Sequence, residues 1–165
     1  MTSAYLRGQE LVDAIQSSSY SRDLIGYHGQ VPHAQWPNQA KIAVQFVLNY
    51  EEGGENHVEH GDLGSEQFLS EIVGAASFNA KHMSMDSMYE YGSRAGFWRI
   101  HQEFQKRCLP MTIFGVGMAL ARNPYVVEAI QQAHYDVVSH GQRWLHYQHI
   151  DIDTERQQMD QAISV

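Results

Sequence analysis

The sequence has few of the features that mark secreted or membrane proteins. It contains one cysteine, Cys108, which excludes an internal disulfide framework and fits a reducing compartment. No apolar run reaches the ~18 residues that a membrane span requires. The N-terminal stretch has no hydrophobic region of a signal peptide. We therefore expect a cytoplasmic protein, with Cys108 buried as a small apolar residue near the end of a helix.

Positive charge is also scarce. Lys and Arg number 11 against 19 Asp and Glu, which gives a net charge of −8. A chain this acidic is not expected to bind nucleic acid or an anionic membrane by charge. The GxGxxG, P-loop and GxSxG patterns are absent too, so the sequence carries none of the common signatures of dinucleotide binding, phosphate binding or serine hydrolysis.

The composition that is present suits a folded domain. Hydrophobic residues make up 43% of the 165 residues and charged residues 18%, which favours a packed core over disorder. Three apolar runs of strand length are separated by segments with helical spacing of apolar residues. The predicted strands cover residues 41–49, 111–116 and 135–139. Helices are predicted around Leu11, Val12 and Ile15, from Ser65, from Ser93 to Cys108, from Asn123-Pro124, and from a capping box of Thr154 and Gln157.

This alternation of strands and helices predicts parallel strands joined by right-handed crossovers. The first strand, 41–49, is nearly continuous in apolar residues, so we expect it to be buried on both faces. Ligand sites in such folds lie at the carboxyl ends of the strands. Three segments meet that condition: Asn49–Glu52, Gly117-Met118 and Ser139–Gly141.

Glu51 and Glu52 are the strongest candidates for chemistry. They directly follow the first strand, and two neighbouring carboxylates repel, which raises one pKa toward the range of a general base. The alternative is a solvated start of a loop. His140 follows the third strand and could be a metal ligand, an acid–base group, an oxyanion donor or simply a ring bonded to the backbone.

Other candidate residues favour a structural interpretation. The pairs His57/His60 and His146/His149 have a spacing that binds zinc on a helix, but no third ligand accompanies either pair, so exposed loop histidines are favoured. An aromatic cluster is expected to pack in the core rather than stack on a substrate. It consists of Tyr89, Tyr91, Phe97 and Trp98.

Three motifs together resemble the polysaccharide deacetylase (NodB-homology) superfamily. They are Asn49–Gly53 at a strand end, Leu109–Gly117 across the next strand, and Val138–His140 at the third. The resemblance implies an α/β fold, here a partial distorted (β/α) barrel. A complete barrel takes ~250 residues, so residues 1–165 are expected to be the N-terminal part of one such domain, with residues 1–40 as a loop-rich extension.

The sequence departs from that superfamily at the residues that hold its divalent metal. Glu51-Glu52 replaces a pair of aspartates, and Trp144 stands where a second metal-binding histidine is expected. These departures resemble one subgroup, the metal-independent bacterial allantoinases. The segments that carry this likeness are Arg22–Tyr27, Val44–Glu55, Tyr89–Gly96 and Ser139–Gly141.

The subgroup implies hydrolysis of the cyclic amide of allantoin to allantoate, without a metal or other cofactor. By alignment, Glu51 is the base, Glu52 its supporting partner, and His140 an oxyanion donor or proton shuttle. Arg143 and Trp144 would line a pocket for the ureide. A homo-oligomer is expected for the full-length protein. Two alternatives are a sugar or peptidoglycan N-deacetylase and an inactive truncated fragment.

Overall fold

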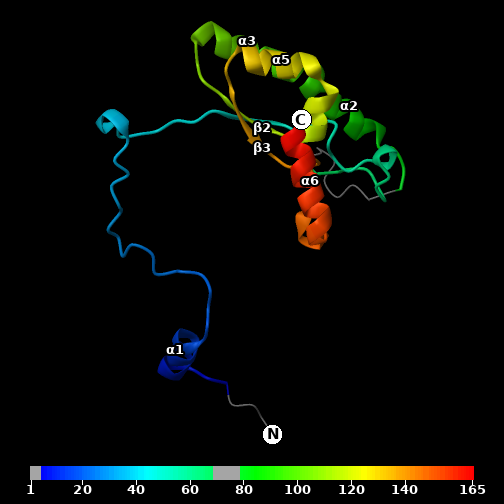
Figure 1. Ribbon diagram of the computed structural model, residues 1–165. Coiled ribbons are helices and arrows are strands. Elements are labelled where there is room, and N and C mark those ends of the chain that lie inside the picture. Colours follow the sequence, from blue (N-terminus) through cyan, green and yellow to red (C-terminus); the bar gives the residue numbers. More distant parts are fainter. Residues whose placement is uncertain (1–4, 69–78) are drawn as a thin grey trace. The chain divides into compact units, whose positions relative to one another are not determined.

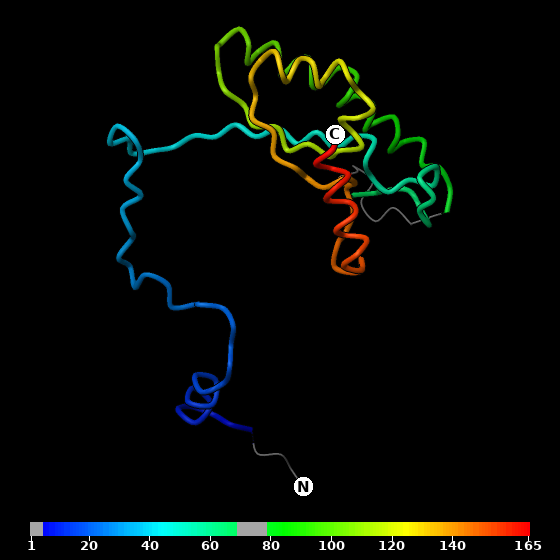
Figure 2. The backbone as a smooth tube through the Cα atoms, in the orientation of Figure 1, coloured from blue at the N-terminus to red at the C-terminus, as the bar shows by residue number. Residues whose placement is uncertain are grey.

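The computed structural model describes residues 5–68 and 79–165 of the chain, which divides into two units, Met1–Ala43 and Val44–Val165. The first unit contains helix α1, Gly8–Ser17, and a 3-10 helix η1, Pro37–Gln39. Every described residue of this unit is exposed to solvent. Figure 2 traces the backbone of the described chain in sequence colours, with this unit in blue to cyan. Helix α1 confirms the helix predicted around Leu11.

The second unit contains a sheet of three parallel strands in the order β1-β2-β3 (Figure 1). The strands are β1, Val47–Tyr50, β2, Thr112–Gly115, and β3, Asp136–Ser139. Val47 pairs with Thr112, which in turn pairs with Asp136. The prediction of three parallel strands is confirmed, and their carboxyl ends lie at one edge of the sheet.

The first strand is shorter and less buried than its apolar run predicted. Of residues 41–49, only those from Val47 onward join β1, and Val47 is 44% exposed. The reason is the hydrogen-bond ladder. β1 pairs with β2 over four residues, and within the described chain no strand lies on its other side. An apolar run becomes a strand only where a neighbour supplies partners for its backbone groups.

Helices follow and cover the strands. The described α-helices of this unit are α2, Met83–Tyr91; α3, Phe97–Arg107; α4, Gly117–Arg122; α5, Pro124–Gln132; and α6, Ile152–Ser164. A π-helical turn, η3, Gly92–Gly96, joins α2 to α3. There are also two short 3-10 turns among the described residues, η2, Val58–His60, and η4, Tyr147–His149. The sequence predicted α3, α5 and α6, left residues 79–92 open, and gave no sign of α4. No helix in the described ranges is long and apolar enough to cross a membrane.

The core lies between the sheet and helices α3 and α5, which Figure 1 shows over the strands. Ile113 of β2 and Val126 of α5 are completely buried. Phe97 of α3 packs edge-on against Tyr50 at the end of β1, with ring centroids 5.7 Å apart. This packing fixes the end of β1, directly before Glu51.

Caps confirm one predicted helix start and correct another, and a third predicted helix lies mostly outside the described chain. The Asn123 side chain accepts a hydrogen bond from the amide of Val126, as predicted for α5. The cap of α6 is Asp151 rather than Thr154, because the Asp151 carboxylate accepts from the amides of residues 153 and 154. Ser65 donates its hydroxyl to the Ala80 carbonyl, and the rest of the helix predicted after it falls on residues 69–78, outside the described chain.

Cys108 is exposed, which contradicts the expectation of a buried residue. It ends α3 with a positive φ of 52°, and its amide bonds back to the last turn of the helix. A residue in this left-handed conformation commonly ends a helix, and here the Cys108 side chain remains in contact with solvent.

Candidate active site

The carboxyl ends of β1 and β3, on either side of β2, bring two predicted residues together. Glu51 follows β1 and His140 follows β3, and the Nε2 atom of His140 lies 2.7 Å from Oε1 of Glu51. The carboxyl group is 18% exposed and the imidazole 35%, so the pair is reachable but partly shielded from water. A short contact between such groups is a charge-assisted or strongly polarised hydrogen bond.

One oxygen of the Glu51 carboxylate, Oε1, is bonded to two side chains, His140 and Asn49. Asn49 at the end of β1 donates its side-chain amide to the same Oε1 atom, at 3.0 Å. Oε1 is thus fixed by Asn49 and His140, which leaves Oε2 as the oxygen that can accept a proton from another group.

Local backbone geometry sets the position of His140. Its amide donates to the Gly115 carbonyl at 2.9 Å, so the β2–β3 ladder continues one residue past β3. Its ring lies 6.0 Å from the ring of Phe114. The chain then turns sharply at Gly141, whose φ of +82° is one that a residue with a side chain rarely adopts. His140 is therefore held at the strand end rather than on a free loop.

A cavity of about 220 Å³ lies beside the pair. Three of its six lining residues, Asn49, Glu55 and Tyr89, were not predicted as site residues, and Tyr89 was expected only to pack in the core. The described lining consists of Asn49, Glu51, Glu52, Glu55, Tyr89 and Trp144. Asn49 could have been found from its place at the strand end, whereas nothing in the sequence singles out Glu55.

Glu52 turns away from the Glu51–His140 contact. Its carboxylate lies against the Cα of Gly92 so closely that a side chain at Gly92 would collide with it. Its Oε2 atom accepts from the amide of Glu51 at 3.3 Å. Burial raises the pKa of Glu52, and the neighbouring carboxylates of Glu51 and Glu55 add to the effect. Glu52 therefore holds a proton more readily than an exposed glutamate.

Tyr89 separates this cavity from a second one of about 300 Å³, which Glu52 and Glu55 also line. Its hydroxyl donates to the Phe68 carbonyl at 2.7 Å. Burial and the surrounding glutamates raise the pKa of Tyr89, so the phenol is a neutral donor at physiological pH.

The other two predicted residues have different surroundings. Trp144 lines the cavity, and its ring lies 5.9 Å from that of Phe68. The guanidinium of Arg143 instead pairs with Asp62 and is absent from the described lining of the cavity. Among the aromatic residues, Phe97 is buried in the core, whereas Tyr91 is 54% exposed.

The residues present do not fit the three-ligand metal site of the polysaccharide deacetylases. Trp144 has no lone pair to offer a metal, and Nε2 of His140 is engaged with Glu51. Across residues 5–68 and 79–165, no group of three His, Cys, Asp or Glu side chains is placed to hold a metal ion. Nδ1 of His57 accepts from the Glu59 amide and its Nε2 faces Asp86, so that ring caps a turn.

The architecture and the site define a class, a parallel α/β fold with a hydrogen-bonded glutamate and histidine at the strand ends. No family model matches the chain. A curated protein of Schizosaccharomyces pombe (strain 972 / ATCC 24843), assigned to the polysaccharide deacetylases, is 42% identical over 146 residues. The match covers 87% of this chain and 46% of that protein.

Two solved structures are similar in both sequence and fold. The crystal structure of PuuE allantoinase shares 51% identity with a TM-score of 0.82, over 90% of this chain and 49% of its own. A structure from Pseudomonas aeruginosa PAO1, named a probable polysaccharide deacetylase, shares 53% identity with a TM-score of 0.81, over 88% and 49%.

By sequence and by fold, the chain is therefore a homologue of the polysaccharide deacetylases. This confirms the α/β fold class and the superfamily resemblance that the motifs indicated. The chain spans about half the length of the relatives that it matches.

Proposed function

We propose that the protein hydrolyses a carbon–nitrogen bond of a cyclic amide, with allantoin as substrate and allantoate as product. The observation that carries this proposal is the contact of 2.7 Å between His140 and Glu51, which lines the cavity. Ring opening by water requires a base, a group that stabilises the oxyanion, and a proton for the leaving nitrogen. The pair supplies groups suited to each of these tasks.

The roles follow from the contacts. Oε1 of Glu51 is held by Asn49 and His140, so Oε2 takes a proton from the attacking water. The hydroxyl adds to the ring carbonyl carbon, the carbon–nitrogen bond of the ring breaks, and the nitrogen receives a proton. Glu51 returns the proton from Oε2 to that nitrogen, and His140, hydrogen-bonded to Oε1, holds the carboxyl group in place during both transfers. General acid–base assistance of this kind contributes ~10²–10⁴-fold to a rate.

The lining of the cavity supports a ureide over an anionic substrate. Three glutamates, Glu51, Glu52 and Glu55, surround a space of about 220 Å³. Carboxylates accept hydrogen bonds and repel negative charge, so they favour a compact molecule rich in N–H groups. Allantoin, a hydantoin ring with a urea arm, has this character. The similarity to PuuE allantoinase supports the same substrate.

An N-deacetylase acting on a sugar or peptidoglycan is the second candidate. It is favoured by the relatives named for polysaccharide deacetylase. The two candidate reactions differ in their need for a metal. The deacetylase chemistry of the family uses a metal ion, and by the resemblance Trp144 replaces one of the residues that hold it.

The test measures both reactions with the intact protein that carries this sequence. We expect conversion of allantoin to allantoate and no release of acetate from N-acetylated oligosaccharides. Acetate release that requires added zinc, without allantoin turnover, would replace the proposal with the deacetylase.

A further inference from the structure

Two loops form the rim of the cavity, and several contacts join them. Residues 51–66 follow β1 and residues 140–146 follow β3. Besides the Glu51–His140 contact, the amide of Trp144 donates to the Gly54 carbonyl at 2.8 Å. The positions of Glu51 and Trp144 therefore depend on how these two loops meet.

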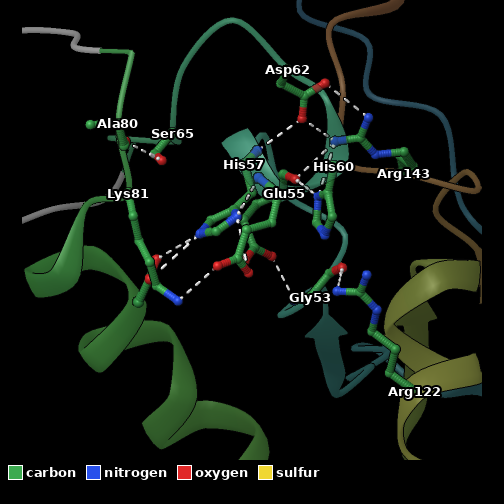
Figure 3. Close-up of polar contacts among 12 residues, drawn as sticks. Gly53, Glu55, His57, His60, Asp62, Ser65, Ala80, Lys81, Arg122 and Arg143 are labelled. Carbon is green, nitrogen blue, oxygen red and sulfur yellow. Dashed lines mark hydrogen bonds and ion pairs between the residues drawn. The ribbon is translucent and has the colours of Figure 1, made fainter.

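Arg143 makes the densest of these connections. Its Nη1 atom donates to Oδ1 of Asp62 at 3.0 Å and its Nη2 atom to Oδ2 at 2.5 Å. Nη2 also donates to the Glu55 carbonyl at 3.0 Å. Figure 3 shows the guanidinium facing Asp62 and the backbone of Glu55. One side chain of the second loop thus holds the first loop at two points.

The pair is largely shielded from water. The side chains of Arg143 and Asp62 are 14% and 20% exposed. Breaking a shielded ion pair leaves an uncompensated charge, so such pairs resist rearrangement more than exposed ones. Asp62 also accepts from the amide of His57 at 2.8 Å. Burial opposes ionisation of Asp62, but the hydrogen bonds and charge of Arg143 outweigh it and lower the pKa of this carboxyl.

We propose that Arg143 is a positioning residue, which fixes the loop of residues 51–66 against the loop of residues 140–146 and so sets the geometry of Glu51, Glu55 and Trp144 around the substrate. It acts through these residues and does not touch the substrate. The planar fork is essential, since two parallel N–H groups fit one carboxylate while a lysine offers a point charge. The kinetic part of this inference rests on the proposed function.

The kinetic test compares Arg143→Lys and Asp62→Asn in the intact protein. A misplacement of ~1 Å can cost about 10²-fold in rate, so we expect kcat to fall tenfold or more with KM changed less than threefold. The double variant is expected to lose no more than either single variant, because both remove the same contact. Arg156→Lys is the matched control, since Arg156 pairs with Asp153 on the exposed surface of α6, at side-chain exposures of 65% and 85%.

A spectroscopic test works without turnover. The 165 residues contain three tryptophans, Trp36, Trp98 and Trp144, and single Trp→Phe variants assign their fluorine resonances in protein labelled with 5-fluorotryptophan. We expect Arg143→Lys and Asp62→Asn to shift the Trp144 resonance and leave the Trp36 resonance in place. Thermal unfolding of each variant confirms that it is folded.

The outcomes separate this inference from the proposed function. If the Trp144 resonance shifts but the wild-type protein does not open allantoin, the positioning role stands and the substrate is wrong. If the resonance does not move in either variant, the positioning role is wrong. The positioning role would also be wrong if Arg143→Lys raised KM without changing kcat and Asp62→Asn changed neither. Arg143 would then be a substrate ligand.

Discussion

Glu51 and His140 are 89 positions apart in the sequence, and their side chains meet at 2.7 Å. The parallel register of β1, β2 and β3 brings about this meeting, because it places the carboxyl ends of β1 and β3 on either side of β2. The same edge carries Asn49 and the loops that bear Glu55 and Trp144. A single feature of the topology therefore assembles the proposed base, its partner and the wall of the cavity.

The first prediction concerns the base. Glu51→Gln is expected to lower kcat for allantoin by about 10²-fold or more with little change in KM, because it removes a group that acts in the transition state. The substitution is nearly isosteric, so the unfolding temperature is expected to stay within a few degrees of the wild type. Steady-state kinetics and a thermal melt measure the two effects.

Glu128→Gln is the matched control for this substitution. Glu128 lies on α5 and bonds to Gln132 at the exposed surface, so its loss is expected to leave kcat and KM unchanged. If Glu51→Gln retained most of the wild-type turnover, the base would lie elsewhere, and Glu52 would be the next residue to test.

The second prediction concerns the metal. Allantoin turnover is expected to survive prolonged treatment with a chelator. The resemblance places Trp144 at one ligand position of the family's metal site, and Nε2 of His140 bonds to Glu51. Activity before and after chelation, with metal content by elemental analysis, measures this. Loss of activity on chelation with recovery on adding zinc would contradict the metal-free assignment.

The sequence predicted the arrangement of the sheet because the relevant signals are local and regular. The apolar runs at 111–116 and 135–139 and the Asn123-Pro124 start of α5 each correspond to an observed element. Parallel topology then followed from alternation. The same logic places Glu51 and His140 at one edge of the sheet.

What the sequence could not predict depends on contacts between distant segments. The length of β1 is set by its ladder with β2 and not by its own apolar run. The cap of α6 went to Asp151 because its carboxylate reaches two amides, which outweighed the capping-box pattern at Thr154. Similarly, the pairing of Arg143 with Asp62 joins residues 81 positions apart, and neither residue type is unusual in a loop.

The third prediction uses the pH dependence of stability. Burial raises the pKa of Glu52 above its ordinary value of 4.5, so the folded state binds this proton more tightly than the unfolded state. The contribution of Glu52 to the unfolding free energy is then full below pH 4.5 and is lost as pH rises through the folded-state pKa. Glu52→Gln has no carboxyl group at this position, so its unfolding free energy does not fall in this way as pH rises. We expect the variant to be more stable than the wild type at pH 7, with no such advantage below pH 4.5.

Asp62→Asn is expected to change the pH dependence of stability in the opposite direction. Arg143 holds the pKa of Asp62 below its ordinary value of 3.8, so its contribution is present above that pH and is lost as pH falls through the folded-state pKa. The variant is expected to be less stable than the wild type at pH 7, and the difference is expected to narrow below pH 3.8. Urea unfolding across pH 3–8 measures both variants; equal pH profiles for the two would contradict the assigned electrostatics.

The last prediction concerns the solution behaviour of the 165-residue polypeptide. Within the described chain, β3 pairs with β2 alone, and Val137 and Val138 are 54% and 43% exposed. On α6, Met159 and Ile163 are 58% and 77% exposed. An apolar strand with unpaired backbone groups on one side is a template for association with another chain. We therefore expect the polypeptide made alone to form large species by light scattering and to have little allantoin turnover.

Val137→Lys is expected to reduce the scattering, because a charge at a strand edge opposes edge-to-edge pairing. Gln132→Lys adds the same charge on α5, away from that edge, and is expected to leave the scattering unchanged, with both variants within ~0.5 kcal/mol of the wild type in stability. A monodisperse monomer with a sharp thermal transition would show that β3 tolerates its exposure and that this polypeptide is a stable domain by itself.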